Sequence, residues 1–156
     1  MLLLRLKTRA TRSRAAAVLA VVAVIAAGGG AANAASGSAV SARAARICNS
    51  HLRVWDGTDV FALSASEVLA MAKALGDTEL RLRRALPSRT WSSTRPVRLS
   101  LRKAAHLGRV YSRAYRADPS DNSLPQEAAF ENSLLDLRRT ASHAGLRACS
   151  IRLATP

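Results

Sequence analysis

The spacing of apolar residues in the C-terminal half of this 156-residue chain is the feature that most constrains its fold. Apolar and small residues recur there in alternating steps of four and three, which places them on one face of an α-helix. One set comprises Val97, Leu101, Ala104, Gly108, Tyr111 and Tyr115, and the other comprises Phe130, Leu134, Leu137, Ala141, Ala144 and Ala148. The spacing predicts one helix from about Pro96 to Ala117 and another from about Ser123 to Cys149.

A capping signal predicts a further helix before these two. Ser64 and Glu67 have the spacing of a capping box, in which each residue satisfies a free amide of the other. Apolar residues then follow at helical spacing until Leu86, immediately before Pro87. We expect a kink or a restart at Gly76-Asp77, because glycine weakens a helix interior.

The apolar pattern between Val40 and Trp55 predicts a first helix over residues 43–55. No period-two strand or Asn-Gly hairpin signal stands out. Four amphipathic segments with short connections, such as residues 87–95, predict an all-α fold, a small antiparallel helical bundle. Small residues on the last two helices are expected to let these helices approach closely; they are Ala104, Gly108, Ala141 and Ala144.

Residues 1–34 have the three parts of a secretory signal peptide. Residues 1–14 carry five basic side chains and no acidic one, residues 15–27 are apolar, and Ala32 and Ala34 are the small residues before the cleavage site. The apolar run has 13 residues, whereas a membrane-spanning helix needs about 20. We expect export by the Sec route, with cleavage before Ala35 or one residue later, and no transmembrane segment in the mature form.

The expected compartment determines how the two cysteines are interpreted. Thiols outside the cytoplasm tend to oxidise, so Cys48 and Cys149 are expected to form one disulfide. In the chain-entropy model, a bridge closing a loop of about 100 residues is worth at most about 4.7 kcal/mol. After the signal peptide we expect a flexible leader over residues 35–46 and a helical bundle domain over residues 47–156.

Basic residues are concentrated in one segment of the chain. The whole sequence has 24 basic and 10 acidic residues, a formal net charge of +14. Residues 80–117 contain 11 basic residues and no acidic one, whereas the rest of the chain after residue 34 has 8 basic and 10 acidic residues. The arginine- and alanine-rich composition is also typical of a GC-rich bacterial genome, which accounts for part of this charge.

Six arginines project from one side of the predicted helix that starts near Pro96. At 100° per residue they lie within an arc of about 60°, opposite the apolar positions. They are Arg95, Arg98, Arg102, Arg109, Arg113 and Arg116. Four further arginines could extend this arginine stripe around the preceding turn, namely Arg81, Arg83, Arg84 and Arg89, and we assign Arg81 and Arg84 to the candidate site. Guanidinium groups bind phosphates and carboxylates in bidentate fashion, which makes the stripe a candidate polyanion-binding face. A merely solvated basic face is the alternative.

The sequence carries no motif typical of catalysis, of metal binding or of cofactor binding. The three histidines, His51, His106 and His143, occur in unrelated contexts. His51 follows Cys48 at metal-ligand spacing, and Tyr111 and Tyr115 could in principle ligate haem, but a disulfide and core packing explain these residues more simply. We predict no catalytic residue, no metal site and no cofactor.

Together these features predict an exported, non-enzymatic cationic protein of the bacterial cell envelope or extracellular space. The expected partner is an anionic polymer, an anionic membrane surface or an acidic protein. Sequence-specific nucleic acid is disfavoured, because Trp91 is the one aromatic residue expected beside the stripe. Two alternatives stay open. One is a small secreted enzyme or a carrier of haem or another ligand, and the other is a protein-binding module such as an inhibitor or chaperone, which an exposed apolar groove would favour.

Overall fold

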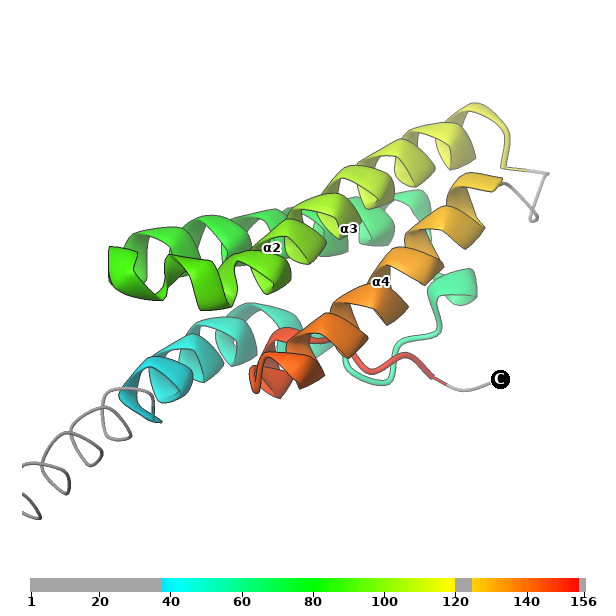
Figure 1. Cartoon of the computed structure of the whole chain (residues 1–156). Coiled ribbons are helices and arrows are strands. Elements are labelled where there is room, and N and C mark those ends of the chain that lie inside the picture. Colours follow the sequence, from blue (N-terminus) through cyan, green and yellow to red (C-terminus); the bar gives the residue numbers. More distant parts are fainter. Residues whose placement is uncertain (1–37, 120–124, 155–156) are drawn as a thin grey trace, which may run out of the picture. The chain divides into compact units, whose positions relative to one another are not determined.

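Four α-helices follow one another along residues 38–119 and 125–154, which are the residues that the computed structural model describes (Figure 1). The first helix is described over residues 38–52, and the others are α2 (Ala65–Ala85), α3 (Trp91–Ala117) and α4 (Pro125–His143). Short 3-10 helices lie between or after them, namely η1 (Arg53–Trp55), η2 (Val60–Ala62), η3 (Ser88–Thr90) and η4 (Arg147–Cys149). The all-α prediction is confirmed for the described residues, and the predicted signal peptide lies outside them.

Helix α3 occupies the middle of the bundle. Residues 40–156 form one compact unit, in which α3 packs against α2 on one side and against α4 on the other. Within this unit α2, α3 and α4 run in alternating directions (Figure 1). One isolated bridge, between Thr58 and Leu153, is the only β-type pairing among the described residues. The predicted helical bundle is therefore confirmed.

The capping box begins α2 as expected, but the expected break at Gly76 does not occur. The Ser64 hydroxyl accepts a hydrogen bond from the Glu67 amide at 3.4 Å, and the Glu67 carboxylate accepts one from the Ser64 amide at 2.8 Å. Helix α2 then continues without interruption to Ala85. Gly76 faces α3, where a Cβ atom would lie 3.7 Å from the Cβ atom of Ala105. Packing against α3 thus overrides the weak helix propensity of glycine.

Helix α3 begins at Trp91, earlier than the predicted start near Pro96. The Trp91 indole donates a hydrogen bond to the Leu86 carbonyl at 3.2 Å, and the buried Thr94 hydroxyl donates one to the Thr90 carbonyl at 3.0 Å. These contacts hold an additional first turn, so Pro96 lies inside the helix. The connector is correspondingly shorter than the predicted residues 87–95. At its other end α3 stops at Ala117, as predicted.

Helix α4 ends at His143 and does not reach Cys149 as predicted. Gly145 has a positive φ of 67°, which glycine adopts readily. Its amide bonds to the Ser142 carbonyl, and the Leu146 amide bonds to the Ala141 carbonyl at 2.8 Å. This pair of hydrogen bonds is a Schellman motif, which terminates helices. Cys149 therefore belongs to η4, and the predicted helix start at Ser123 lies outside the described residues.

The first helix begins closer to the N-terminus than the predicted residue 43. Residues 38–46, which fall within the predicted flexible leader, are helical, and Ala44 is fully buried. The α-helix ends at residue 52 and continues as η1 up to Trp55. Burial of Ala44 beside the buried Cys48 accounts for the ordering of this segment.

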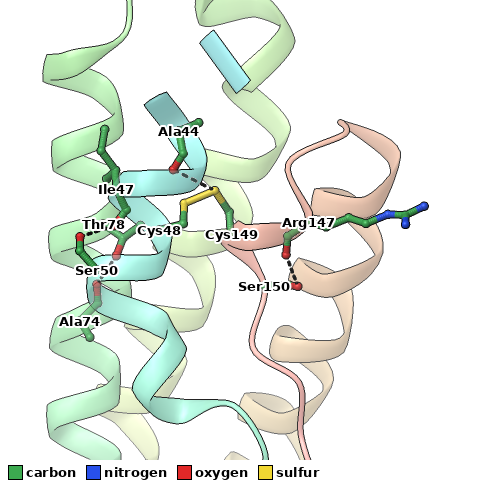
Figure 2. Close-up of a disulfide and its surroundings, with 9 residues drawn as sticks. All are labelled: Ala44, Ile47, Cys48, Ser50, Ala74, Thr78, Arg147, Cys149 and Ser150. Atoms are coloured by element: carbon green, nitrogen blue, oxygen red, sulfur yellow. Dashed lines mark hydrogen bonds between the residues drawn. A yellow bond between two sulfur atoms is a disulfide. The ribbon is translucent and has the colours of Figure 1, made fainter. Parts of the chain in front are cut away.

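The predicted disulfide joins the first helix to η4 (Figure 2). Cys48 and Cys149 are both fully buried and are separated by 101 residues in the sequence. The segment after η4 is fixed by further contacts, because the Gly57 amide bonds to the Arg152 carbonyl and the Ala154 amide bonds to the Thr58 carbonyl. The C-terminal segment is thus attached to the turn that follows the first helix.

Gly108 lies at a close contact of α2, α3 and α4. A Cβ atom at this position would lie 2.9 Å from the Ala72 Cβ atom on α2 and 2.9 Å from Phe130 Cε2 on α4. These distances are shorter than normal packing contacts. The predicted close approach of α3 and α4 therefore involves α2 as well.

We expect alanine substitutions at the two helical glycines, Gly76 and Gly108, to have opposite effects on stability. Gly108→Ala overpacks the contact of the three helices and should lower the free energy of unfolding by about 1 kcal/mol or more, even after the gain in helix propensity. Gly76→Ala meets ordinary contact distances and should raise it by about 0.5–1 kcal/mol. Urea unfolding of both variants measures the difference. A Gly108→Ala protein as stable as the wild type would contradict the packing described here.

Candidate anion-binding face

The six arginines of the predicted stripe all lie within α3, on the side left uncovered by its neighbours. The helix buries its apolar face, which includes Val97, Leu101, Ala104, Ala105, Gly108 and Tyr111. Arg98 is half-buried, and the other five arginines of the stripe are exposed. The segregation of charge from apolar side chains on α3 is therefore present in the folded chain.

One arginine of the stripe is neutralised by the protein itself. Arg102 Nη2 lies 3.0 Å from Glu79 Oε1 on α2 and forms a hydrogen-bonded ion pair. The Glu79 side chain is 5% exposed, whereas the Arg102 side chain is 58% exposed. A buried carboxylate without a cation is strongly unfavourable, so Arg102 has a structural role in addition to any binding role.

Two further arginines of the stripe are positioned by contacts within α3. The Arg98 guanidinium lies 5.5 Å from the centre of the Trp91 ring and donates a hydrogen bond to the Trp91 carbonyl. Arg113 Nε donates to the Arg109 carbonyl at 3.3 Å. Neither contact neutralises the positive charge. Five arginines of the stripe therefore have no ion pair with another described residue.

The stripe borders a groove between α2 and α3, which consists of two adjoining depressions. One has a volume of about 460 Å³ and is lined by Lys73, Leu80 and Arg109, among others. The other has a volume of about 500 Å³ and is lined by Arg83, Arg95, Arg98 and Trp91, among others. Glu79 and Arg102 line both depressions and so mark where they meet. We call this feature the α2–α3 groove.

Arg81 and Arg84, assigned to the site from the sequence, lie away from the α2–α3 groove. They line a separate depression together with Ile47 of the first helix. Arg83 reaches the groove instead. At 100° per residue, Arg83 is only about 40° from Glu79 around α2, whereas Arg84 is about 140° away. This difference becomes informative only once Glu79 is known to pair with Arg102 on α3.

A buried carboxylate lies on the other side of α3. Glu127 on α4 is 5% exposed and accepts a hydrogen bond from Tyr111. Burial raises the pKa of Glu127, and the charges of Glu131 and Asp59 raise it further, while the bond from Tyr111 acts in the opposite direction. Burial and the Glu127 charge raise the pKa of Tyr111 to about 12, which keeps the phenol protonated as a donor.

The raised pKa of Glu127 predicts a pH-dependent stability. The folded protein binds the proton on the Glu127 carboxyl more tightly than the unfolded chain does. The stability that this proton contributes is therefore complete below the unfolded pKa near 4.5 and is lost as pH rises through the folded pKa. Glu127→Gln should remove this loss, and its stability relative to wild type should therefore be higher at pH 7 than at pH 4. Urea unfolding at both pH values tests this, with Asp136→Asn on α4 as the control. A stability difference that is equal at the two pH values would contradict the assignment.

The residues considered for metal or haem binding do not converge. His106 is exposed on α3, whereas Tyr111 is buried and packs against Tyr115 and Phe130, with ring centres 6.0 and 6.2 Å away. Within the described ranges, no group of three or more His, Cys, Asp or Glu side chains could hold a metal ion. Among the same residues, no helix combines the length and the apolar character needed to cross a bilayer.

Comparisons with protein-family models, with curated proteins and with solved structures found no match to this chain.

Proposed function

We propose that this protein is exported and binds an anionic polymer along the arginine stripe and the α2–α3 groove. The observation that carries the proposal is the line of six arginines on α3, five of them exposed, in which only Arg102 pairs with a carboxylate of another described residue. Arg83 adds a further positive charge from α2. A bidentate contact with phosphate, sulfate or carboxylate would satisfy these guanidiniums.

The length of the stripe favours an extended ligand over a compact one. Arg95 and Arg116 are 21 residues apart on a continuous helix, which corresponds to about 32 Å. Several charged units of a linear polymer can contact the stripe at once and release counterions, so binding should weaken steeply with salt. A membrane surface or an acidic protein would share the charge dependence, but neither requires a linear arrangement.

Charge reversal on the stripe tests this function. Arg109→Glu with Arg113→Glu should lower affinity for immobilised polyphosphate at least tenfold, measured as elution at lower salt, because two exposed contacts become repulsive. Arg102 is left unchanged, because its loss would leave Glu79 buried without a partner.

The control is Arg43→Glu with Arg46→Glu on the first helix, which changes the net charge equally at exposed positions away from the stripe. Circular dichroism confirms that all variants remain helical. Equal loss of retention in the control, or unchanged retention of the stripe variant, would contradict the proposal.

Export is tested separately by the N-terminus of the protein produced in a bacterial host. We expect the secreted form to begin at Ala35 or one residue later, because Ala32 and Ala34 are the small residues before the predicted cleavage site. Edman sequencing or intact mass measures this directly. Recovery of the uncleaved chain from the membrane fraction would contradict the prediction.

One observation favours a protein-binding module as a second candidate function. Leu69 and Leu80 are 37% and 44% exposed and line the α2–α3 groove beside the charged residues. An amphipathic acidic helix could bury these two leucines while its carboxylates contact the arginines. Binding to such a partner would depend less on salt than binding to a polymer, because part of the interface is apolar.

A further inference from the structure

A second cluster of arginines lies where the first helix, α4 and the C-terminal segment meet. The pocket there has a volume of about 570 Å³. Four arginines line it, namely Arg53, Arg138, Arg147 and Arg152. Pockets of this volume commonly hold small molecules. Since none of these residues belongs to the arginine stripe, the pocket is a distinct feature.

The four arginines that line the pocket come from four different segments of the chain. Arg53 comes from η1 after the first helix, Arg138 from α4, Arg147 from η4 and Arg152 from the C-terminal segment. Neutral donors are interspersed, since Asn49 and Ser142 also line the cavity. A ligand inside would therefore meet positive charge and hydrogen-bond donors from several directions.

A single carboxylate in the pocket wall balances one of the four arginines. Asp56 Oδ2 lies 3.3 Å from Arg152 Nη2, and Asp56 Oδ1 accepts a hydrogen bond from the Arg152 amide at 2.9 Å. Both carboxylate oxygens are thus engaged by the same residue. Arg53, Arg138 and Arg147 form no ion pair with another described residue, which leaves an excess charge of about +3 in the pocket.

The disulfide holds two of the walls together. Cys48 precedes Asn49 on the first helix, and Cys149 lies between Ala148 and Ser150. Figure 2 shows the Arg147 side chain extending away from the disulfide, while its carbonyl accepts a hydrogen bond from the Ser150 hydroxyl at 2.7 Å. The disulfide therefore fixes the first helix against η4, which limits the reorganisation that these two walls of the pocket need for binding.

We propose that this pocket binds a small, soluble, multiply charged phosphate compound. A phosphate group presents oxygens in three or more directions, which suits guanidiniums that come from separate walls, whereas a carboxylate presents two oxygens in one plane. The four exposed arginines surround one open, concave site, which suits a free molecule better than a headgroup in a flat membrane surface. This site is independent of the polymer-binding groove.

Calorimetric titration of the mature, oxidised protein with tripolyphosphate tests the proposal, with citrate at equal ionic strength as the comparison. Tripolyphosphate should bind more tightly than citrate. Arg138→Gln and Arg147→Gln should each lower the affinity about tenfold, because each removes a charge-assisted contact. Arg139→Gln, at the neighbouring position on α4 but outside the pocket lining, should change it by less than about twofold.

Binding should also persist when the stripe carries Arg109→Glu with Arg113→Glu, which separates this site from the proposed polymer-binding function. Loss of tripolyphosphate binding in that variant would place the ligand on α3 and overturn the proposal. Equal affinity for citrate would overturn the assignment to phosphate. Unchanged affinity in both Arg138→Gln and Arg147→Gln would show that the pocket is not the binding site.

Discussion

Helix α3 is packed on two sides, by α2 and by α4, and this constraint determines where its charge can lie. Gly108 allows both neighbours to approach the same level of the helix. Apolar side chains fill the covered arc, so arginines can occupy only the part of the circumference that faces water. The groove, the stripe and the burial of Tyr111 all follow from this arrangement.

The ion pair between Glu79 and Arg102 affects both the packing of α2 against α3 and the charge of the groove. Glu79 is nearly inaccessible, yet it lines both depressions of the groove through its pairing with Arg102. The pair connects α2 to α3 and lowers the local positive charge at the middle of the groove. The positive charge of the groove is greatest in the depression lined by Arg83, Arg95 and Arg98, because Asp77 lines the depression near Arg109.

Local signals in the sequence were sufficient for most of the fold. The capping box at Ser64, the apolar spacing of α3 and the pairing of Cys48 with Cys149 were predicted correctly. The errors concern helix ends and interruptions. Gly76 proved compatible with an uninterrupted helix because α3 packs against it, and the turn at Gly145 depends on a positive φ that spacing alone does not reveal.

The candidate sites were less accessible to sequence reasoning. A helical projection predicted the stripe because its residues belong to one helix. Neither the pairing of Arg102 with Glu79, 23 residues away, nor the pocket formed by residues between 49 and 152 is encoded in any local pattern. Such groups are brought together by tertiary packing alone, so they are visible only once the helices have been positioned.

The disulfide also determines how the molecule responds to proteolysis. Cys48 and Cys149 enclose α2, α3, α4 and the turns between them in one covalent ring. A protease that cuts a turn inside this ring, such as residues 56–63, opens the ring without releasing a fragment. The cut protein therefore keeps all of its helices in one covalent molecule until a reductant breaks the sulfur–sulfur bond, which is advantageous wherever proteases are abundant and reductants are scarce.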